Sequence, residues 1–393
     1  MDADAAFVTD AGQDVLARLE ALGPEVRARA AETEAGNRLP PDLSQKLKAT
    51  GVFRIFVPKS HGGLELSFPD GLKVLQAAAR IDGSLGWVVT IGVTAPLLFC
   101  RLPRQVFDQL YAGGPDLVQA GAAATPGGFA EKVEGGMKAW GRWPFASGCQ
   151  HADVILGNCA ILEGGEPVKD AATGMPVSRM VVLPAADFEI EDTWHVSGLK
   201  GTGSHHVRLP ERIIPEERFF PMHGPSCVEG PLYTNLGAWI PLMHAVFAVG
   251  VAEGAIAELV EMATGGRKQL FARASMKDSP IFQYELGQLD AELAAARALL
   301  NERTNLQWSR ALDGSIFRPD AMATSMQAGV WTTDAGIRVC EAAYRLGGGS
   351  ALYESSPLQR RMRDLLAAGQ HAVVQRQNYQ GLGAALLGIG PGR

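Results

Sequence analysis

Two helix-rich stretches flank a stretch of short strands, and this order limits the possible folds more than any other feature of the sequence. Residues 11–112 have the spacing of helices, residues 115–222 alternate short apolar runs with Gly, Pro and Asp clusters, and helices return after residue 235. The strands are not followed by regular helices, so we do not expect a doubly wound sheet. We predict an α+β fold, mainly α, with domains at residues 1–114, 115–222 and 223–393.

Local signals place individual elements within this plan. The segment LPPDLSQKLKATGVF has prolines at a predicted helix start and Gly51 at its end, and the next helix is predicted to begin near Ser67–Asp70. The runs VILGNCAIL (154–162) and SRMVVLPA (178–185) are predicted strands. A stripe at helical spacing predicts a helix packed in a bundle: Leu286, Leu289, Leu293, Ala296 and Leu300.

Composition excludes several classes of protein. The net charge of −6 argues against a nucleic-acid partner. Five scattered cysteines without a CxxC pair argue against a disulfide framework, so we expect a reducing cytoplasm. The start, MDADAAFVTD, lacks the pattern of a signal peptide. The apolar stretches 85–100 and 238–252 are too short for a membrane span and are predicted to be buried helices.

The common catalytic and nucleotide-binding motifs are absent. The segment GTGSHH (201–206) begins like GxGxxG, but His206 stands at the third glycine and no strand–helix unit surrounds it. The sequence has no GxxxxGK[ST], HExxH or GxSxG motif. Adjacent strand residues point to opposite faces, so His205 and His206 do not predict a metal site.

Four segments in a fixed order carry a family resemblance: WPFASGCQHAD (143–153), DTWHVSGLKGTGSHHVRLP (192–210), GGRKQLF (265–271) and RLGGGSALYESSPLQRRMRD (345–364). Together they resemble the acyl-CoA dehydrogenase superfamily over nearly the whole chain. The resemblance implies an N-terminal helical domain, a central β-barrel-like domain and a C-terminal four-helix bundle, with a flavin held between the last two. It also implies a homotetramer.

An isoalloxazine is a flat, apolar ring with a polar edge at N5 and O4, so it requires aromatic walls and hydrogen-bonding groups at that edge. Trp143, Phe145 and Trp194 can supply walls, and the Ser147 hydroxyl can supply the edge contact. The resemblance places the flavin-bonding serine two residues after an aromatic, which matches Phe145 and Ser147. The alternative is a core aromatic cluster with a turn serine.

Two further matches are implied by the resemblance. Arg267 stands where the family uses an arginine on the phosphate end of the flavin, often across a subunit boundary; the alternative is a solvated surface charge. Gly348 and Gly349 would let the backbone approach a cofactor closely, or they would stop a helix.

The dehydrogenase base is the point at which the sequence departs from the larger family. Many acyl-CoA dehydrogenases carry a glutamate after an Arg-Asp pair, to remove a proton next to a thioester. Here the pair is Arg363–Asp364, and the corresponding position is Ala372, preceded by His371. The segments SPLQRRMRDLLAAGQH and RIDGSLGWVV (80–89) instead resemble the oxygenase components of two-component flavin-dependent monooxygenases.

That second resemblance implies a reaction and its partners. A separate NAD(P)H-dependent flavin reductase would supply FADH2 or FMNH2, which reacts with O2 to a C4a-hydroperoxyflavin and hydroxylates a small aromatic or heteroaromatic, phenol- or indole-like substrate. Ser147 would hold the N5–O4 edge, and His371 would hydrogen-bond the peroxide or take a substrate proton.

Three alternatives stay open. His371 lies alone in an apolar run that is predicted to be helical. Such a histidine is often an ordinary core residue, and this is the first alternative for His371. Some relatives carry a second histidine after a GW segment, but GWVVTIGVTAP has none, which argues against a two-histidine mechanism. An acyl-CoA dehydrogenase with a base relocated to the start of the bundle, or a catalytically inactive flavin-binding protein, would share the fold.

Overall fold

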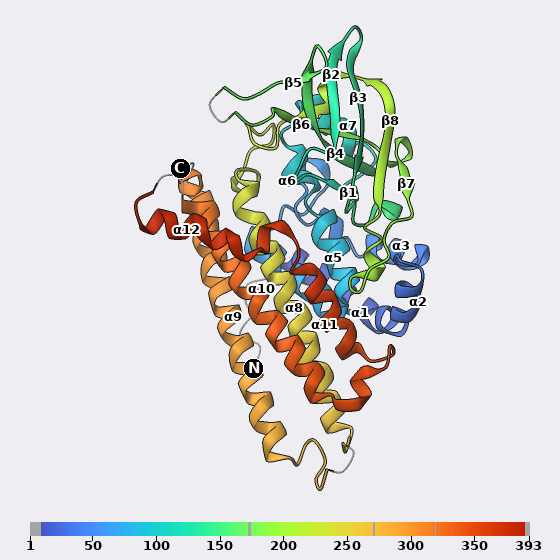
Figure 1. Ribbon diagram of the computed structural model, residues 1–393, viewed down its shortest axis with the longest axis vertical. Helices are drawn as coiled ribbons and strands as arrows, with labels where there is room; N and C mark the ends of the chain where they lie inside the picture. The colour runs from blue at the N-terminus through green and yellow to red at the C-terminus, as the bar shows by residue number, and fades with distance from the viewer. Residues whose placement is uncertain (1–8, 172–173, 270–271, 319, 390–393) are drawn as a thin grey trace.

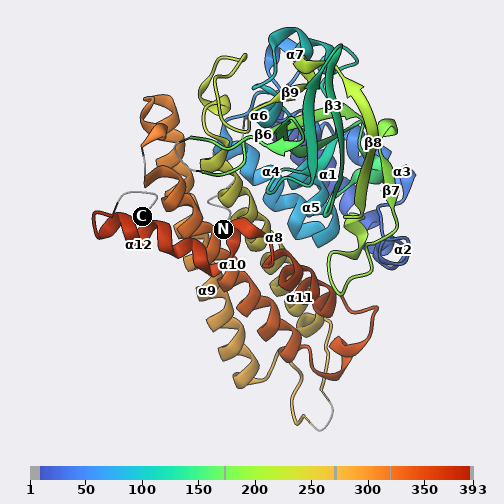
Figure 2. The same cartoon turned by 45° about the horizontal axis from the view of Figure 1, so that its top comes forward.

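The computed structural model describes residues 9–171, 174–269, 272–318 and 320–389. The N-terminal region is helical. The chain folds into a β-domain above a long helical bundle, with the N-terminal helices packed against both (Figures 1 and 2). The first seven helices are α1 (Asp10–Ala28), α2 (Ala30–Ala35), α3 (Pro41–Ala49), α4 (Phe68–Ile81), α5 (Gly83–Gly92), α6 (Ala95–Phe99) and α7 (Arg104–Tyr111).

Two predicted helix boundaries in this region are confirmed. Helix α3 begins at Pro41, and Gly51 follows it with a φ of 82°, a conformation that favours glycine. The Ser67 hydroxyl accepts a hydrogen bond from the Asp70 backbone N–H at 3.2 Å and caps α4.

The central domain is one mixed, mainly antiparallel sheet with the path β7-β8-β3-β2-β4-β6-β9, and β1 and β5 pair with β4. The predicted runs 154–162 and 178–185 form the antiparallel pair β4–β6. The strands are β1 (Gln119–Ala122), β2 (Gly128–Val133), β3 (Gly136–Trp143), β4 (Val154–Glu163), β5 (Glu166–Pro167), β6 (Ser178–Pro184), β7 (Glu189–Glu191), β8 (His206–Ile214) and β9 (Phe219–Phe220).

Trp143 fills the interior of this β-domain. Its indole is completely buried and donates its Nε1–H to the Asn158 carbonyl at 2.7 Å. Glycines on three strands make the space for the ring, because a Cβ on any of them would overlap the indole: Gly128, Gly141 and Gly157. Trp143 is therefore a core residue rather than a wall for a ligand, which corrects the expectation from sequence.

The C-terminal bundle is built from α8 (Leu236–Thr264), α9 (Pro280–Leu312), α10 (Asp320–Leu346) and α11 (Pro357–Ala368), followed by α12 (Tyr379–Leu386). Helix α10 packs on α8, α9 and α11. The predicted stripe on α9 is confirmed, because Leu289, Leu293, Ala296 and Leu300 are buried and Leu286 is half-buried against the same core. Within the described residues, α8 is the one helix long and apolar enough to cross a membrane, but 78% of its most apolar window is buried inside the protein, as in a core helix.

The loop that precedes β8 packs on the backbone of α11. A Cβ on Gly198 would overlap the Arg363 carbonyl, and Leu199 donates its backbone N–H to Asp364 Oδ1 at 2.6 Å. The β-domain and the bundle are thus in direct backbone contact here, with no room for a side chain at Gly198.

Replacing Gly198 by alanine is expected to destabilise the protein by about 1–3 kcal/mol, because rigid backbone would have to move. The matched control is Gly287→Ala on the exposed face of α9, where an added Cβ meets nothing within 4 Å. That change is expected to stabilise by about 0.5–1 kcal/mol, because glycine is costly inside a helix. Urea unfolding measures both; equal effects of the two variants would contradict the packing described.

Candidate active site

Two segments singled out from the sequence lie against each other at the end of the β-domain. Ala146 donates its backbone N–H to the His205 carbonyl at 3.0 Å, and Gly148 donates to the Thr202 carbonyl at 2.8 Å. Gly148 has a φ of 77°, which lets the turn after Ser147 close. The pairing fixes Ser147 beside Ser204 in the protein interior, with both side chains buried.

The Ser147 hydroxyl belongs to a chain of hydrogen bonds. Its Oγ accepts from Trp87 Nε1–H at 3.0 Å and lies 2.7 Å from Ser204 Oγ. Ser204 Oγ lies 2.7 Å from Thr202 Oγ1, which donates to the Leu199 carbonyl at 2.8 Å.

The donor–acceptor direction along these hydrogen bonds follows from Thr202, the last hydroxyl in the series. A carbonyl can only accept, so the single hydroxyl proton of Thr202 is donated to the Leu199 carbonyl. Ser204 must therefore donate its proton to Thr202, and Ser147 must donate its proton to Ser204. The remaining lone pair of Ser147 is therefore free to accept a hydrogen bond, and the hydroxyl has no proton left to donate.

Trp87 connects Ser147 to two histidines. The indole of Trp87 on α5 lies edge-to-face against His244 of α8, with ring centroids 5.3 Å apart, and against His371 at 5.8 Å. The two imidazoles lie 4.2 Å apart between centroids and are tilted by 32°. We call these five residues the serine–histidine cluster: Trp87, Ser147, Ser204, His244 and His371.

His371 does not lie on a helix, which corrects the sequence prediction. Helix α11 ends at Ala368, and His371 is the N-cap of the short helix η11 (Ala372–Val374), with its Nδ1 accepting from the Val373 N–H at 3.4 Å. Burial, and then the neighbouring His244, hold the pKa of His371 well below its ordinary value. The imidazole is therefore neutral near pH 7.

Two aromatic side chains from the segments that carry Ser147 and Ser204 pack on each other. Phe145 is 65% exposed, and its ring lies edge-to-face against Trp194 at 6.3 Å between centroids. Its φ of 63° is rare for a bulky residue, so the fold holds this apolar ring outward at a cost in backbone strain. The indole Nε1–H of Trp194 is used by the Leu199 carbonyl at 3.0 Å.

The other residues predicted to bind the cofactor lie elsewhere. Arg267 is exposed in the loop after α8, and Gly348 follows the end of α10 with a φ of 62°. These two segments meet at the end of the bundle, where the Gln269 side chain donates to the Leu346 carbonyl at 2.8 Å (Figure 1). Gly348 and Gly349 thus stop α10, and Arg267 and both glycines lie apart from the serine–histidine cluster.

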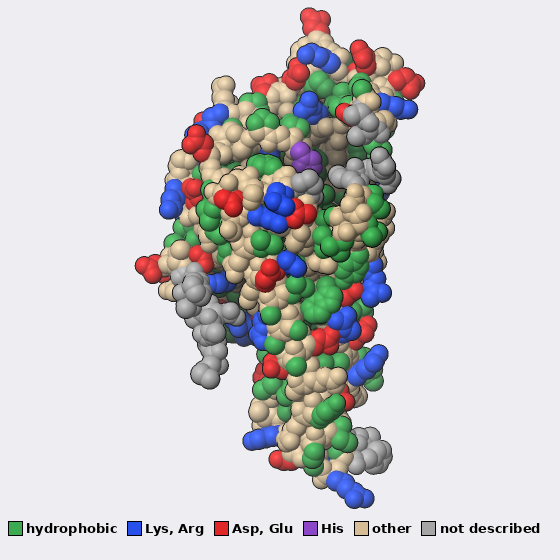
Figure 3. Space-filling view, turned by 90° about the vertical axis from the view of Figure 1, so that its left-hand side faces the viewer, with side chains coloured by type: hydrophobic (Ala, Val, Ile, Leu, Met, Phe, Trp, Pro, Cys, Tyr) green, Lys and Arg blue, Asp and Glu red, His purple; other side chains and the backbone are tan. Residues whose placement is uncertain are grey.

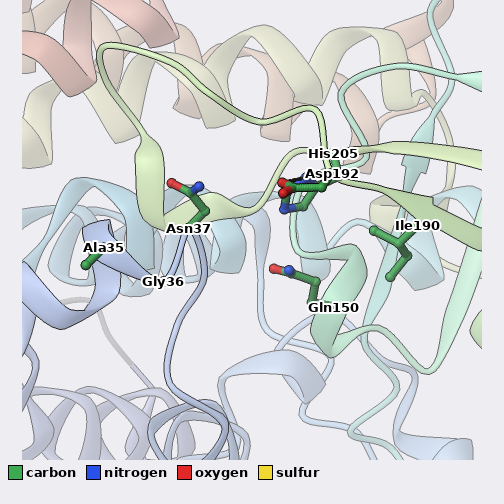
Figure 4. A pocket seen from close by; sticks show the side chains of 7 residues that line it. All are labelled: Ala35, Gly36, Asn37, Gln150, Ile190, Asp192 and His205. Carbon is green, nitrogen blue, oxygen red and sulfur yellow. Dashed lines mark ion pairs between the residues drawn. The ribbon is translucent and has the colours of Figure 1, made fainter.

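A hollow of about 380 Å³ opens beside the β-domain but does not include the cluster (Figure 4). His205 is buried in its wall, accepts from the Thr193 and Trp194 backbone N–H groups on Nδ1, and is 3.6 Å from Asp192. The lining is polar apart from one large side chain, so it offers no walls for a flat apolar ring. It is lined by Ala35, Gly36, Asn37, Gln150, Ile190, Asp192 and His205.

The Arg-Asp pair of the C-terminal motif has a structural task. Asp364 is almost fully buried where α11, Leu199 and the start of α5 at Gly83 meet. Burial, followed by repulsion from Asp82, raises the pKa of Asp364 to about 7. Because the pKa of Asp364 is higher in the folded than in the unfolded protein, protonated Asp364 contributes to the stability of the fold. This contribution is fully present below the unfolded-state pKa of about 3.9 and is lost as the pH rises through 7.

Asp364→Asn is expected to gain stability relative to the original protein as the pH rises. The amide oxygen can still accept from Leu199, but the side chain cannot ionise. The difference in unfolding free energy should widen by about 2–3 kcal/mol between pH 5 and pH 8. Urea titrations at both pH values measure it, with exposed Asp290→Asn as control; a constant difference would contradict a buried, protonated Asp364.

Comparisons with known proteins identify the family of the chain. Residues 20–99 match the model of the acyl-CoA dehydrogenase N-terminal domain, and residues 242–376 match that of the acyl-CoA dehydrogenase C-terminal domain. The chain belongs to the acyl-CoA dehydrogenase superfamily, and the predicted fold class is confirmed.

Two similar proteins and one solved structure indicate the branch of the superfamily. The chain is 31% identical over 385 residues to an indole-3-acetate monooxygenase from Acinetobacter baumannii, covering 97% of this chain and 96% of the relative. It is 30% identical to the oxygenase component of an FADH(2)-dependent resorcinol hydroxylase from Rhizobium sp., covering 96% and 95%. The crystal structure of the 3-HSA hydroxylase from Rhodococcus sp. RHA1 superposes with a TM-score of 0.87 at 26% identity, covering 97% and 98%. The chain is a flavin-dependent monooxygenase of the two-component oxygenase branch.

The serine–histidine cluster and the aromatic pair fit a reduced flavin. Reduced flavin carries a hydrogen on N5, which needs an acceptor, and Ser147 offers a lone pair and no proton. Oxidised flavin has an acceptor at N5 and would find no donor in the Ser147 hydroxyl. Phe145, two residues before Ser147, and Trp194 are the apolar rings that would pack against the flavin.

Three residues of the cluster were not predicted as site residues from the sequence: Trp87, Ser204 and His244. Trp87 lies in RIDGSLGWVV, and His244 lies in AWIPLMHAVFAVGVA, where it is the one ionisable side chain of an otherwise apolar run. That isolation was the available signal, because an imidazole is costly to bury without a partner.

Proposed function

We propose that the chain hydroxylates a small aromatic or heteroaromatic, phenol- or indole-like substrate, using O2 and FADH2 or FMNH2 delivered by a separate NAD(P)H-dependent flavin reductase. The observation that carries the proposal is that Ser147 and a neutral His371 both contact Trp87: its Nε1–H donates to Ser147, and its ring lies edge-to-face against His371. The names of the indole-3-acetate and resorcinol relatives support this substrate class, and the second supports FADH2.

When bound, reduced flavin supplies the electrons that activate O2. The residues of this chain then have separate tasks. Ser147 would accept a hydrogen bond from the N5 hydrogen. Trp87 donates to Ser147 and so holds it in place, and the apolar rings of Trp87 and Phe247, with centroids 5.2 Å apart, would exclude water. The neutral His371 carries its proton on Nε2, because Nδ1 accepts from Val373, so it can donate to an oxygen at the site.

A dehydrogenase with a relocated base is not supported by the carboxylates of α8. The first of them along the helix is Glu253, which forms an ion pair with Arg297 at 3.0 Å and accepts from Gln76 at 2.8 Å. Glu258 lies 3.5 Å from Arg361. No carboxylate belongs to the serine–histidine cluster in the described part of the chain, and Ala372 is exposed.

The surface of the bundle supports the proposed homotetramer. Figure 3 shows hydrophobic side chains exposed along the column of the bundle, where a lone subunit would leave them in water. Light scattering on the purified chain tests this assembly. Large exposed examples are Ile281, Tyr284, Leu312, Phe317, Leu386 and Leu387.

The experiment that tests the function combines the purified chain with a generic flavin reductase, NADH, FAD or FMN, air and a panel of phenols, indoles and amino sugars. We expect a mass gain of one oxygen atom on a phenol or indole. Oxidation of an acyl-CoA in place of any aromatic would favour the dehydrogenase. The five free thiols support carrying out the assay under the reducing conditions of the expected cytoplasmic setting.

A further inference from the structure

His244 is a polar side chain that is buried in an otherwise apolar stretch of α8. It lies on α8 between Leu242 and Val246, it is 5% exposed, and its ring packs on His371 and Trp87. Burial lowers its pKa to about 4, so the imidazole is neutral near pH 7.

The tautomer of His244 follows from its one hydrogen bond. Its Nδ1 lies 2.9 Å from the Ile240 carbonyl, which can only accept, so Nδ1 carries the proton and Nε2 carries a lone pair. That Nε2 is enclosed and has no hydrogen-bond partner among the described residues. A buried acceptor without a donor costs about 1–3 kcal/mol, so the position calls for a donor that the described chain does not provide.

His371 has the opposite tautomer, with a proton on Nε2. The stacked pair therefore combines one acceptor with one donor beside Trp87. His371 lies between α11 and η11 rather than within a long helix, so it can yield to a ligand at lower cost than α5 or α8.

We propose that His244 is a second active-site histidine that selects substrates by accepting a hydrogen bond on Nε2 from a ring N–H or O–H group. The inference rests on the proposed function and names its substrate class: aromatic molecules with a donor on the ring, such as indoles and phenols, in preference to ethers of the same shape. It places the second histidine on α8 rather than after the GW segment.

The test uses the flavin-free protein, so binding is separated from oxygenation. Indole and benzofuran have the same shape, but benzofuran has an oxygen in place of the N–H. Calorimetry should give a dissociation constant for indole about 5–150-fold lower than for benzofuran, which is the unpaired-acceptor cost expressed as affinity. His244→Phe keeps an aromatic ring against Trp87 and should reduce this ratio at least about fivefold.

Two further variants make the result specific. His244→Gln offers an acceptor again and should restore part of the preference for indole. His223→Phe, on an exposed histidine before α8, should leave the ratio unchanged. Thermal unfolding of each variant confirms that it is folded.

The outcomes separate this inference from the proposed function. An unchanged ratio in His244→Phe, equal binding of both ligands, or no binding of indole or phenol by the original protein would overturn the role of His244. Aromatic hydroxylation by the original protein would stand in each of these cases. Failure to hydroxylate any aromatic, with the binding ratio intact, would overturn the function and leave the selection by His244.

Discussion

His371→Ala is expected to lower the hydroxylated product formed per flavin oxidised by about 10²–10⁴-fold, the usual worth of a positioned acid or base. His371 packs against Trp87 and carries the Nε2 proton that it can donate at the site. Alanine leaves that position without a proton donor and without a ring. Oxidation of the flavin by O2 should continue, because Ser147 is not changed. Chromatography of the product and the flavin absorbance measure the two quantities in one reaction.

The control for this variant is the exposed neighbour Gln370→Ala, which should keep the original ratio of product to oxidised flavin. A His371→Ala protein that forms as much product as the control would show that His371 is an ordinary buried histidine. A loss of product together with a loss of reduced-flavin binding in an anaerobic titration would instead indicate a general defect in folding or flavin binding.

Ser147→Ala is expected to reduce the preference for reduced over oxidised flavin by about 5–150-fold, which corresponds to about 1–3 kcal/mol for an N5 hydrogen left without an acceptor. The reason is the direction of the hydrogen bonds from Ser147 to Ser204 and from Ser204 to Thr202. Ser147 uses its proton on Ser204, so it can only accept from the flavin. Anaerobic titration with reduced flavin and aerobic titration with oxidised flavin give the two dissociation constants.

Ser204→Ala tests the direction of that chain in the opposite sense. It frees the Ser147 proton, which can then be donated to N5 of oxidised flavin, so binding of the oxidised form should tighten. Ser355→Ala, on an exposed serine, is the matched control. If Ser204→Ala and Ser355→Ala bind oxidised flavin equally, the proposed direction of the chain is wrong.

The order of elements could be predicted because it depends on local patterns. The stripe on α9 and the β-branched runs of β4 and β6 are periodic over several residues, and both were confirmed. The segments around Ser147 and Ser204 could be named from their resemblance to a family, and the structure shows that they are hydrogen-bonded to each other.

The misplaced residues depend on contacts between distant positions. Trp143 was expected to be a wall, but glycines on β2, β3 and β4 give its indole room inside the sheet, and no local pattern reveals that. The end of α11 at Ala368 follows from Gly369 and the capping role of His371, so periodicity extended the helix too far. Trp87 and His244 meet only because α5 packs on α8.

We propose that this chain transfers one atom of O2 to an aromatic ring at the serine–histidine cluster. The most direct measurement supplies isotopically labelled O2 with reduced flavin and an indole or phenol that the panel identifies as a substrate, and follows the product by mass spectrometry. This proposal predicts that one labelled oxygen atom appears in the product, and that His371→Ala abolishes most of the labelled product. A product that carries oxygen from water, or a labelled product that is unchanged in the His371→Ala variant, would contradict it.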